Sequence, residues 1–142
     1  MRAFRLWLLG MFLVTVVNIV NRARYKNSIK DLSKAERKMK MYNYDLQEAK
    51  ALNSFGNRNY RTLWNDIFKK PEGYKFGVDG EMMSSALGKN EVDKTLTTKG
   101  EQGLVKYFFG ERMVRILNRL DPNHCFKAID LTKGEWNFPD KK

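Results

Sequence analysis

The chain has 142 residues, a length that allows one folded domain beside a short terminal segment. Hydrophobic residues make up 42% of it and charged residues 30%, with 10 glycines and 3 prolines, which excludes a disordered or collagen-like chain. Cys125 is the one cysteine and His124 the one histidine, which excludes an intramolecular disulfide and a four-ligand Cys/His zinc site. We therefore expect a folded protein without a metal or a cofactor.

The net charge of +11 is concentrated near the N-terminus. Residues 1–30 carry six basic residues and no acidic one, whereas residues 31–142 carry 21 basic and 16 acidic residues. Most of the excess flanks one apolar run, so it favours an anionic membrane surface over nucleic acid as the partner. Nucleic-acid binding by the remaining charge is an alternative, and it predicts an affinity that falls steeply with salt.

An apolar run from Leu6 to Val20 predicts a transmembrane anchor within residues 1–25, with Trp7 near its start as an interfacial aromatic residue. At 1.5 Å per residue the run spans about 22 Å, short of the roughly 30 Å hydrocarbon core. A full crossing therefore recruits flanking residues, with Arg5 and Arg22 reaching toward the headgroups. The side chains that we expect in lipid are Leu6, Trp7, Leu8, Leu9, Met11, Phe12, Leu13, Val14, Val16, Val17, Ile19 and Val20.

Three other interpretations of this run are a cleaved signal peptide, a mitochondrial presequence and an interfacial helix. A signal peptide needs small residues at a cleavage site, and Asn18 to Arg22 offers none. An interfacial helix has one polar face, whereas residues 6–17 are apolar all round apart from Thr15. We therefore expect a retained, single-pass helix. The basic residues that follow it favour a cytoplasmic C-terminal body, and an exported body is the alternative.

Residues 26–56 predict an amphipathic stalk helix. Ser33 and Glu36 have the spacing of a capping box at a helix start, and Gly56 is the expected C-terminal cap. Apolar residues between them alternate three and four apart, which places them on one stripe. The stripe either binds a partner as a coiled coil or packs on the chain's own C-terminal domain, and its length of three heptads slightly favours the latter. Its residues are Leu32, Ala35, Met39, Tyr42, Leu46 and Ala49.

Residues 57–142 predict a small α-rich domain. A short helix over 60–68 is ended by the segment around Pro71, and residues 74–80 predict a loop or short strand. Residues 84–100 are polar and interrupted by glycines, so they predict no long helix. A longer helix over about 101–120 is ended by Asp121-Pro122. The apolar side chains of the tail predict that it packs on the domain. The expected core residues are Trp64, Phe68, Phe108 and Trp136.

Few residues suggest chemistry. His124 and Cys125 are adjacent, and neighbouring side chains rarely point at each other, so we expect a buried cysteine and a histidine that closes a turn. Asp79 and Glu81 lack the spacing of an EF-hand, and the nearby glycines match no phosphate loop. We therefore predict a protein that is not an enzyme. An enzyme with a Cys125 or a carboxylate site is the alternative.

About half of the chain, residues 60–131, resembles short open reading frames of tailed bacteriophages and prophages, which typically carry patterns such as DETISS-LGK and LDP-HC-KSIE. The chain departs from them at Met82-Met83, where Thr-Ile is usual, and at Asp130, where Glu is usual. The segments that carry the resemblance are Trp64-Asn65, Asp79-Gly80-Glu81, Ser84 to Lys89, Leu117 to Cys125 and Lys127 to Asp130.

These reading frames have no assigned activity, so the resemblance implies a bacteriophage source and not a mechanism. It also draws attention to polar residues that could converge in space as a shared cluster. The members of this possible cluster are Asp79, Glu81, Ser84, His124 and Cys125.

Anchor, stalk and domain together predict a membrane-anchored protein, and the resemblance implies a bacteriophage protein of the host inner membrane. We expect it to bind another membrane or virion protein, in lysis, exclusion or virion assembly. The alternative is a single-span accessory subunit of a large membrane complex, such as a respiratory complex. The expected partners are the lipid bilayer and a protein, and we expect neither nucleic acid nor a small-molecule substrate.

Overall fold

A computed structural model of the chain describes residues 2–101 and 107–139. The described residues form six helices and no β-strand, and one isolated antiparallel bridge joins Lys69 and Leu96. The predicted mainly helical fold is confirmed. The chain divides into two compact units, Met1–Gln47 and Glu48–Lys142, and the boundary lies inside the second helix.

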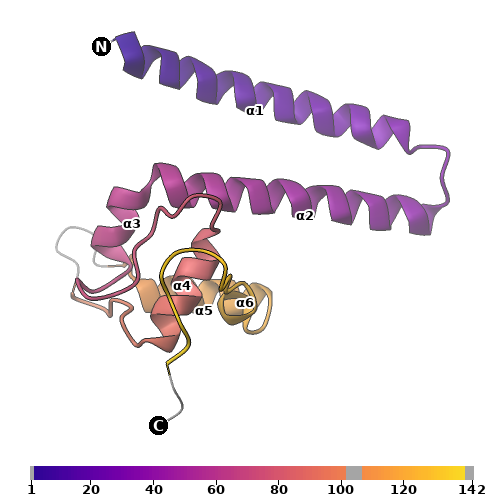
Figure 1. Cartoon of the computed structure of the whole chain (residues 1–142). Helices are drawn as coiled ribbons and strands as arrows, with labels where there is room; N and C mark the ends of the chain where they lie inside the picture. The colour runs from indigo at the N-terminus through magenta and orange to yellow at the C-terminus, as the bar shows by residue number, and fades with distance from the viewer. Residues whose placement is uncertain (1, 102–106, 140–142) are drawn as a thin grey trace. The chain divides into compact units, whose positions relative to one another are not determined.

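The first unit contains α1 (Arg2–Ser28) and the start of α2 (Lys34–Asn59), joined by a short turn (Figure 1). Between Ala3 and Val20 no side chain of α1 is buried, although nearly all of them are apolar. Straight-chain and branched apolar residues form a regular helix here because no proline interrupts it. The first unit is therefore a helix that is apolar and exposed on every side, followed by a polar bend.

A small set of side chains joins α1 to α2 near the bend. The guanidinium of Arg22 donates two hydrogen bonds, each 2.9 Å long, to the two carboxylate oxygens of Asp45. The amide of Asn21 donates to the Tyr44 hydroxyl at 3.0 Å, and the rings of Tyr25 and Tyr44 stack with centroids 4.6 Å apart. These contacts hold the two helices side by side at the polar end of α1.

The capping box predicted at the start of α2 is present. Ser33 N–H donates to Glu36 Oε2 at 3.0 Å, and Glu36 N–H donates to Ser33 Oγ at 3.3 Å. The hydrogen bonds from Ser33 lower the pKa of the Glu36 carboxyl. The predicted helix end at Gly56 is wrong, because α2 continues to Asn59, and the Gly56 carbonyl accepts the indole N–H of Trp64 at 2.9 Å. That tertiary contact stabilises the helix past its glycine.

The second unit contains the end of α2 and four further helices: α3 (Arg61–Ile67), α4 (Met83–Val92), α5 (Gly110–Leu120) and α6 (His124–Lys127). Helix α4 lies at its centre and packs against both α5 and α6 (Figure 1). The core cluster consists of Ile67, Phe68, Phe76, Ala86, Leu87, Leu96, Val114 and Cys125.

Helix α4 corrects the interpretation of residues 84–100 as a polar, punctuated segment. Its residues Ser84 to Asn90 are all buried, although most of them are small or polar. Small side chains allow close approach, and a Cβ on Gly88 would collide with the backbone carbonyl of Cys125 in α6. The helix lacks an apolar stripe because it is surrounded on all sides, so the usual 3.6-residue pattern does not appear.

The helix predicted from about residue 101 begins only at Gly110, and residues 102–106 lie outside the described residues. Phe109 is extended, and the Gly110 N–H donates to Thr97 Oγ1 at 2.9 Å. A Cβ on Gly110 would collide with the carbonyl of Phe68, so the glycine is needed for this close approach.

The predicted core is correct at Phe68 and Trp136, which are buried, and Trp64 packs against the core while partly exposed. The prediction for Phe108 is wrong, because this residue is 38% exposed. It lies in the extended segment just before α5, and its ring centroid is 5.3 Å from that of Phe68. The described part of the tail packs as predicted, since the Trp136 indole N–H donates to Asp93 Oδ2 at 2.6 Å.

Candidate functional site

An ion pair lies in the interior of the second unit. The ammonium of Lys89 is 2.7 Å from Glu81 Oε1, and both side chains are wholly inaccessible to solvent. Lys89 Nζ also donates to the carbonyl of Lys133 at 2.6 Å and to the Tyr74 hydroxyl at 3.2 Å, and it lies 4.2 Å from the centroid of the Tyr74 ring. The charge is therefore paired and fully hydrogen-bonded, as a buried lysine requires.

The carboxylate of Glu81 is equally well satisfied. Ser85 Oγ donates to Oε1 at 2.7 Å, and the Tyr74 hydroxyl donates to Oε2 at 2.9 Å. Burial, followed by the bond to Glu81, raises the pKa of Tyr74, so the phenol stays a donor at neutral pH. Ser85 Oγ in turn accepts the backbone N–H of Asp130 at 3.0 Å. This network links α4 to the loop before it and to the tail.

Serine, lysine and tyrosine in contact are also the parts of some nucleophilic sites. Here Ser85 and Lys89 have no exposed surface. Their polar atoms are hydrogen-bonded within the network, which stabilises the buried charges. The arrangement is therefore a stabilising centre of the second unit.

The side chains of the polar cluster predicted from the sequence do not come together; they lie in different parts of the second unit. Asp79 is exposed and pairs with Arg58, with the Arg58 Nε to Asp79 Oδ1 distance 3.3 Å. Ser84 Oγ accepts the side-chain amide of Asn53 at 3.1 Å, and Glu81 belongs to the buried network. These three acidic and hydroxyl side chains thus contact different partners.

His124 and Cys125 do not form a catalytic pair. The His124 ring lies against Asp121, with Nδ1 3.3 Å from Oδ2, while Cys125 is fully buried in the core. Burial and the nearby carboxylate of Glu91 raise the pKa of the Cys125 thiol to about 12. The thiol is therefore protonated at neutral pH, and the predicted burial of Cys125 is confirmed.

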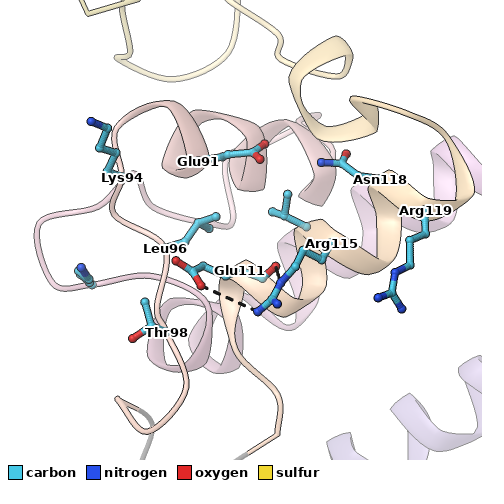
Figure 2. Close-up of a pocket in the computed structure, with 10 residues that line it drawn as sticks. Glu91, Lys94, Leu96, Thr98, Glu111, Arg115, Asn118 and Arg119 are labelled. Atoms are coloured by element: carbon cyan, nitrogen blue, oxygen red, sulfur yellow. Dashed lines mark hydrogen bonds and ion pairs between the residues drawn. The ribbon is translucent and has the colours of Figure 1, made fainter.

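A cavity of about 660 Å³ in the second unit opens between α4, the loop after it and α5 (Figure 2). Leu96 and Val114 contribute apolar surface, and two acidic and four basic side chains also line it. Asn118 Oδ1 is buried there without a hydrogen-bond partner among the described residues. Burial raises the pKa of the Glu91 carboxyl at the same cavity. The basic side chains around it are Lys70, Lys94, Arg115 and Arg119.

This cavity was not visible in the sequence. Its lining comes from three separate stretches of chain, and the one hint was the basic series on the last long helix, to which Arg115 and Arg119 belong. Figure 2 shows the side chains of Glu111 and Arg115 directed toward each other; the distance from Arg115 Nη2 to Glu111 Oε2 is 4.0 Å. Among residues 2–101 and 107–139, no group of three or more His, Cys, Asp or Glu side chains is placed to bind a metal ion.

The predicted partner-binding stripe on α2 is largely exposed. Met39 and Tyr42 are more than half exposed, Ala35 and Ala49 are exposed, Leu46 is 39% exposed and Leu32 is half-buried. Of the two residues that contact α1, Tyr44 lies about 160° around the helix from Tyr42, whereas Asp45 lies about 60° from it, at the edge of the stripe. The stripe therefore remains open where the sequence placed a contact surface.

Comparisons with protein-family models, with curated proteins and with solved structures find no match. One described helix, Ala3–Ser28, is long and apolar enough to cross a membrane; its most apolar 18-residue window has a mean hydropathy of 2.0 and no buried residue. Signal sequences and core helices of soluble proteins also meet this criterion.

Proposed function

We propose that the protein is a single-pass membrane protein, anchored in a bilayer by α1, that acts by binding another protein at the membrane surface. The observation that carries this proposal is the exposed apolar surface of α1. Transfer of its twelve predicted anchor side chains out of water is worth on the order of 20 kcal/mol. An apolar surface of this extent is unusual on soluble monomers, which rarely expose contiguous patches above a few hundred Å².

The resemblance to bacteriophage reading frames supports the inner membrane of an infected bacterium as the site of action, in lysis, exclusion or virion assembly. A role in binding is supported by two features of the described chain. The stripe on α2 presents Met39 and Tyr42 to solvent, while the buried Glu81–Lys89 pair and the protonated Cys125 thiol are positioned for stability.

Extraction of cell membranes with alkaline carbonate tests the anchor. We expect the full chain to stay in the membrane pellet, and the double substitution Leu9→Arg with Val16→Arg to release it, since each arginine costs about 3 kcal/mol at a helix centre in the membrane. Leu120→Arg is the matched control, because Leu120 is 81% exposed on the second unit. Release of the unmodified protein by carbonate would contradict the proposal.

Site-specific photo-crosslinking in the host cell tests the binding surface. A photoreactive residue at position 42 is expected to crosslink a second protein, because Tyr42 is exposed on the stripe. Position 40 is the control: Lys40 is also exposed, but it lies about 200° around α2 from Tyr42. Equal products at both positions, or none at position 42, would remove the stripe as the contact surface.

A further inference from the structure

The bend between α1 and α2 contains a cleft of about 470 Å³ within the first unit. Its lining includes Ile29, which is buried, and Met41, which is half-buried. Five basic side chains line it and no acidic one does. The five are Lys26, Lys30, Lys34, Arg37 and Lys38.

The positive charge of this cleft is not neutralised within the hairpin. Among the described residues none of its five basic side chains takes part in an ion pair. Of the nearby acids, Glu36 is engaged with Ser33 and Asp45 with Arg22, while Asp31 is exposed in the turn and does not line the cleft. The positive potential of the cleft therefore attracts a compact anion.

The position of the cleft along α1 points to the source of that anion. The 27 residues of α1 extend for about 40 Å, whereas the hydrocarbon core is about 30 Å thick. When the apolar part of the helix occupies the core, its last turns reach the level of the lipid phosphates. The cleft begins there, at Ala23 and Lys26.

We propose that this cleft binds the phosphate of an anionic lipid headgroup, an inference that rests on the proposed anchoring by α1. The lysine ammonium groups and the arginine guanidinium contact the phosphate oxygens. The apolar side chains of Ile29 and Met41 contact the glycerol and the first methylene groups of the lipid. Anionic lipid is the expected occupant because clusters of four to eight basic residues directly after a membrane helix bind such headgroups. The lipid then orders the bend beside the membrane.

Native mass spectrometry of the full chain in mild detergent tests this inference, with phosphatidylglycerol and phosphatidylcholine of the same acyl chains titrated as a mixture. We expect a clear preference for phosphatidylglycerol. The triple substitution Lys30→Gln, Lys34→Gln and Lys38→Gln is expected to reduce the preference by on the order of a hundredfold, since each lysine near an anionic lipid surface strengthens binding about fivefold. All three side chains are exposed, so the substitutions leave the fold intact.

The control removes the same amount of charge elsewhere, with Lys40→Gln, Lys50→Gln and Lys75→Gln, all of them exposed and outside the cleft. It is expected to keep most of the preference. An equal loss in both triple variants means that net charge alone attracts the lipid, and it overturns the inference. Displacement of the lipid by inorganic phosphate overturns it as well, because the cleft then takes free phosphate.

The outcome is separable from that of the anchor. A protein that resists carbonate extraction but shows no preference for phosphatidylglycerol keeps the proposed function and loses this inference. A protein that carbonate releases loses the anchor itself.

Discussion

Replacing Lys89 by methionine is expected to destabilise the second unit severely. The substitution removes the ammonium that lies 2.7 Å from Glu81 Oε1 and leaves that carboxylate charged in a site without solvent. It also removes the donor of the 2.6 Å bond to the Lys133 carbonyl. Loss of one partner of a buried pair costs about 3–5 kcal/mol, a large fraction of the roughly 5–15 kcal/mol by which folded domains are stable.

Urea unfolding of the full chain in detergent measures this loss through the fluorescence of Trp64 and Trp136, both in the second unit. Arg58→Gln is the control, because it breaks the exposed pair with Asp79 and is expected to change the unfolding midpoint little. The double variant Glu81→Gln with Lys89→Met removes both charges.

The cost of the double variant is expected to be smaller than the sum of the two single substitutions, since neither charge is left alone. The reasoning about the buried pair is refuted if Lys89→Met is as mild as Arg58→Gln, or if the two single effects simply add.

Other predictions follow from the glycines, the thiol and the helix cap. Gly88→Ala is expected to lower the free energy of unfolding by about 1–3 kcal/mol, because its Cβ would collide with the Cys125 carbonyl. Gly56→Ala has room for its Cβ and is expected to raise the free energy of unfolding by about 0.5–1 kcal/mol. Urea unfolding midpoints compare the two variants. The Cys125 thiol, buried and with a pKa of about 12, is expected to resist maleimide in the folded chain and to take one label in urea, as mass spectrometry records. Ser33→Ala is expected to raise the pKa of Glu36 toward its ordinary value in a carboxyl NMR titration. In the unmodified chain the lowered pKa of Glu36 stabilises the start of α2 above the ordinary carboxyl pKa, and this contribution disappears as the pH falls through the lowered value.

Local sequence signals predicted several features correctly. The capping box of Ser33 and Glu36 depends on residues three positions apart, and both of its hydrogen bonds form. The short helix before Pro71 and the end of α5 at Leu120 also follow from nearby residues, because proline cannot continue a helix. Each of these features is decided by side chains that touch within one turn.

The central helix of the second unit escaped this kind of prediction. Ser84, Ser85 and Lys89 belong to residue types that usually face water, and here each is buried. The burial of Ser85 and Lys89 depends on Glu81 and Tyr74, which belong to the loop before α4, and on the backbone of the tail, whereas Ser84 accepts a hydrogen bond from Asn53 in α2. A polar residue is stable inside a protein only when a partner satisfies it, and the partner is not written at any fixed spacing.

The candidate sites also divide into those that a continuous stretch of sequence determines and those that depend on tertiary contacts. The apolar run over residues 6–20 and the basic residues after it are continuous in the chain, so the sequence by itself determined that α1 is an apolar helix with a positive end. Tertiary structure alone decided that Glu81 and Lys89 pair, that Asn118 lies at a cavity and that Asp79, His124 and Cys125 do not converge. Hydrophobicity and charge add up along a segment whatever surrounds it, whereas a buried polar contact exists only once distant segments have been brought within hydrogen-bonding distance.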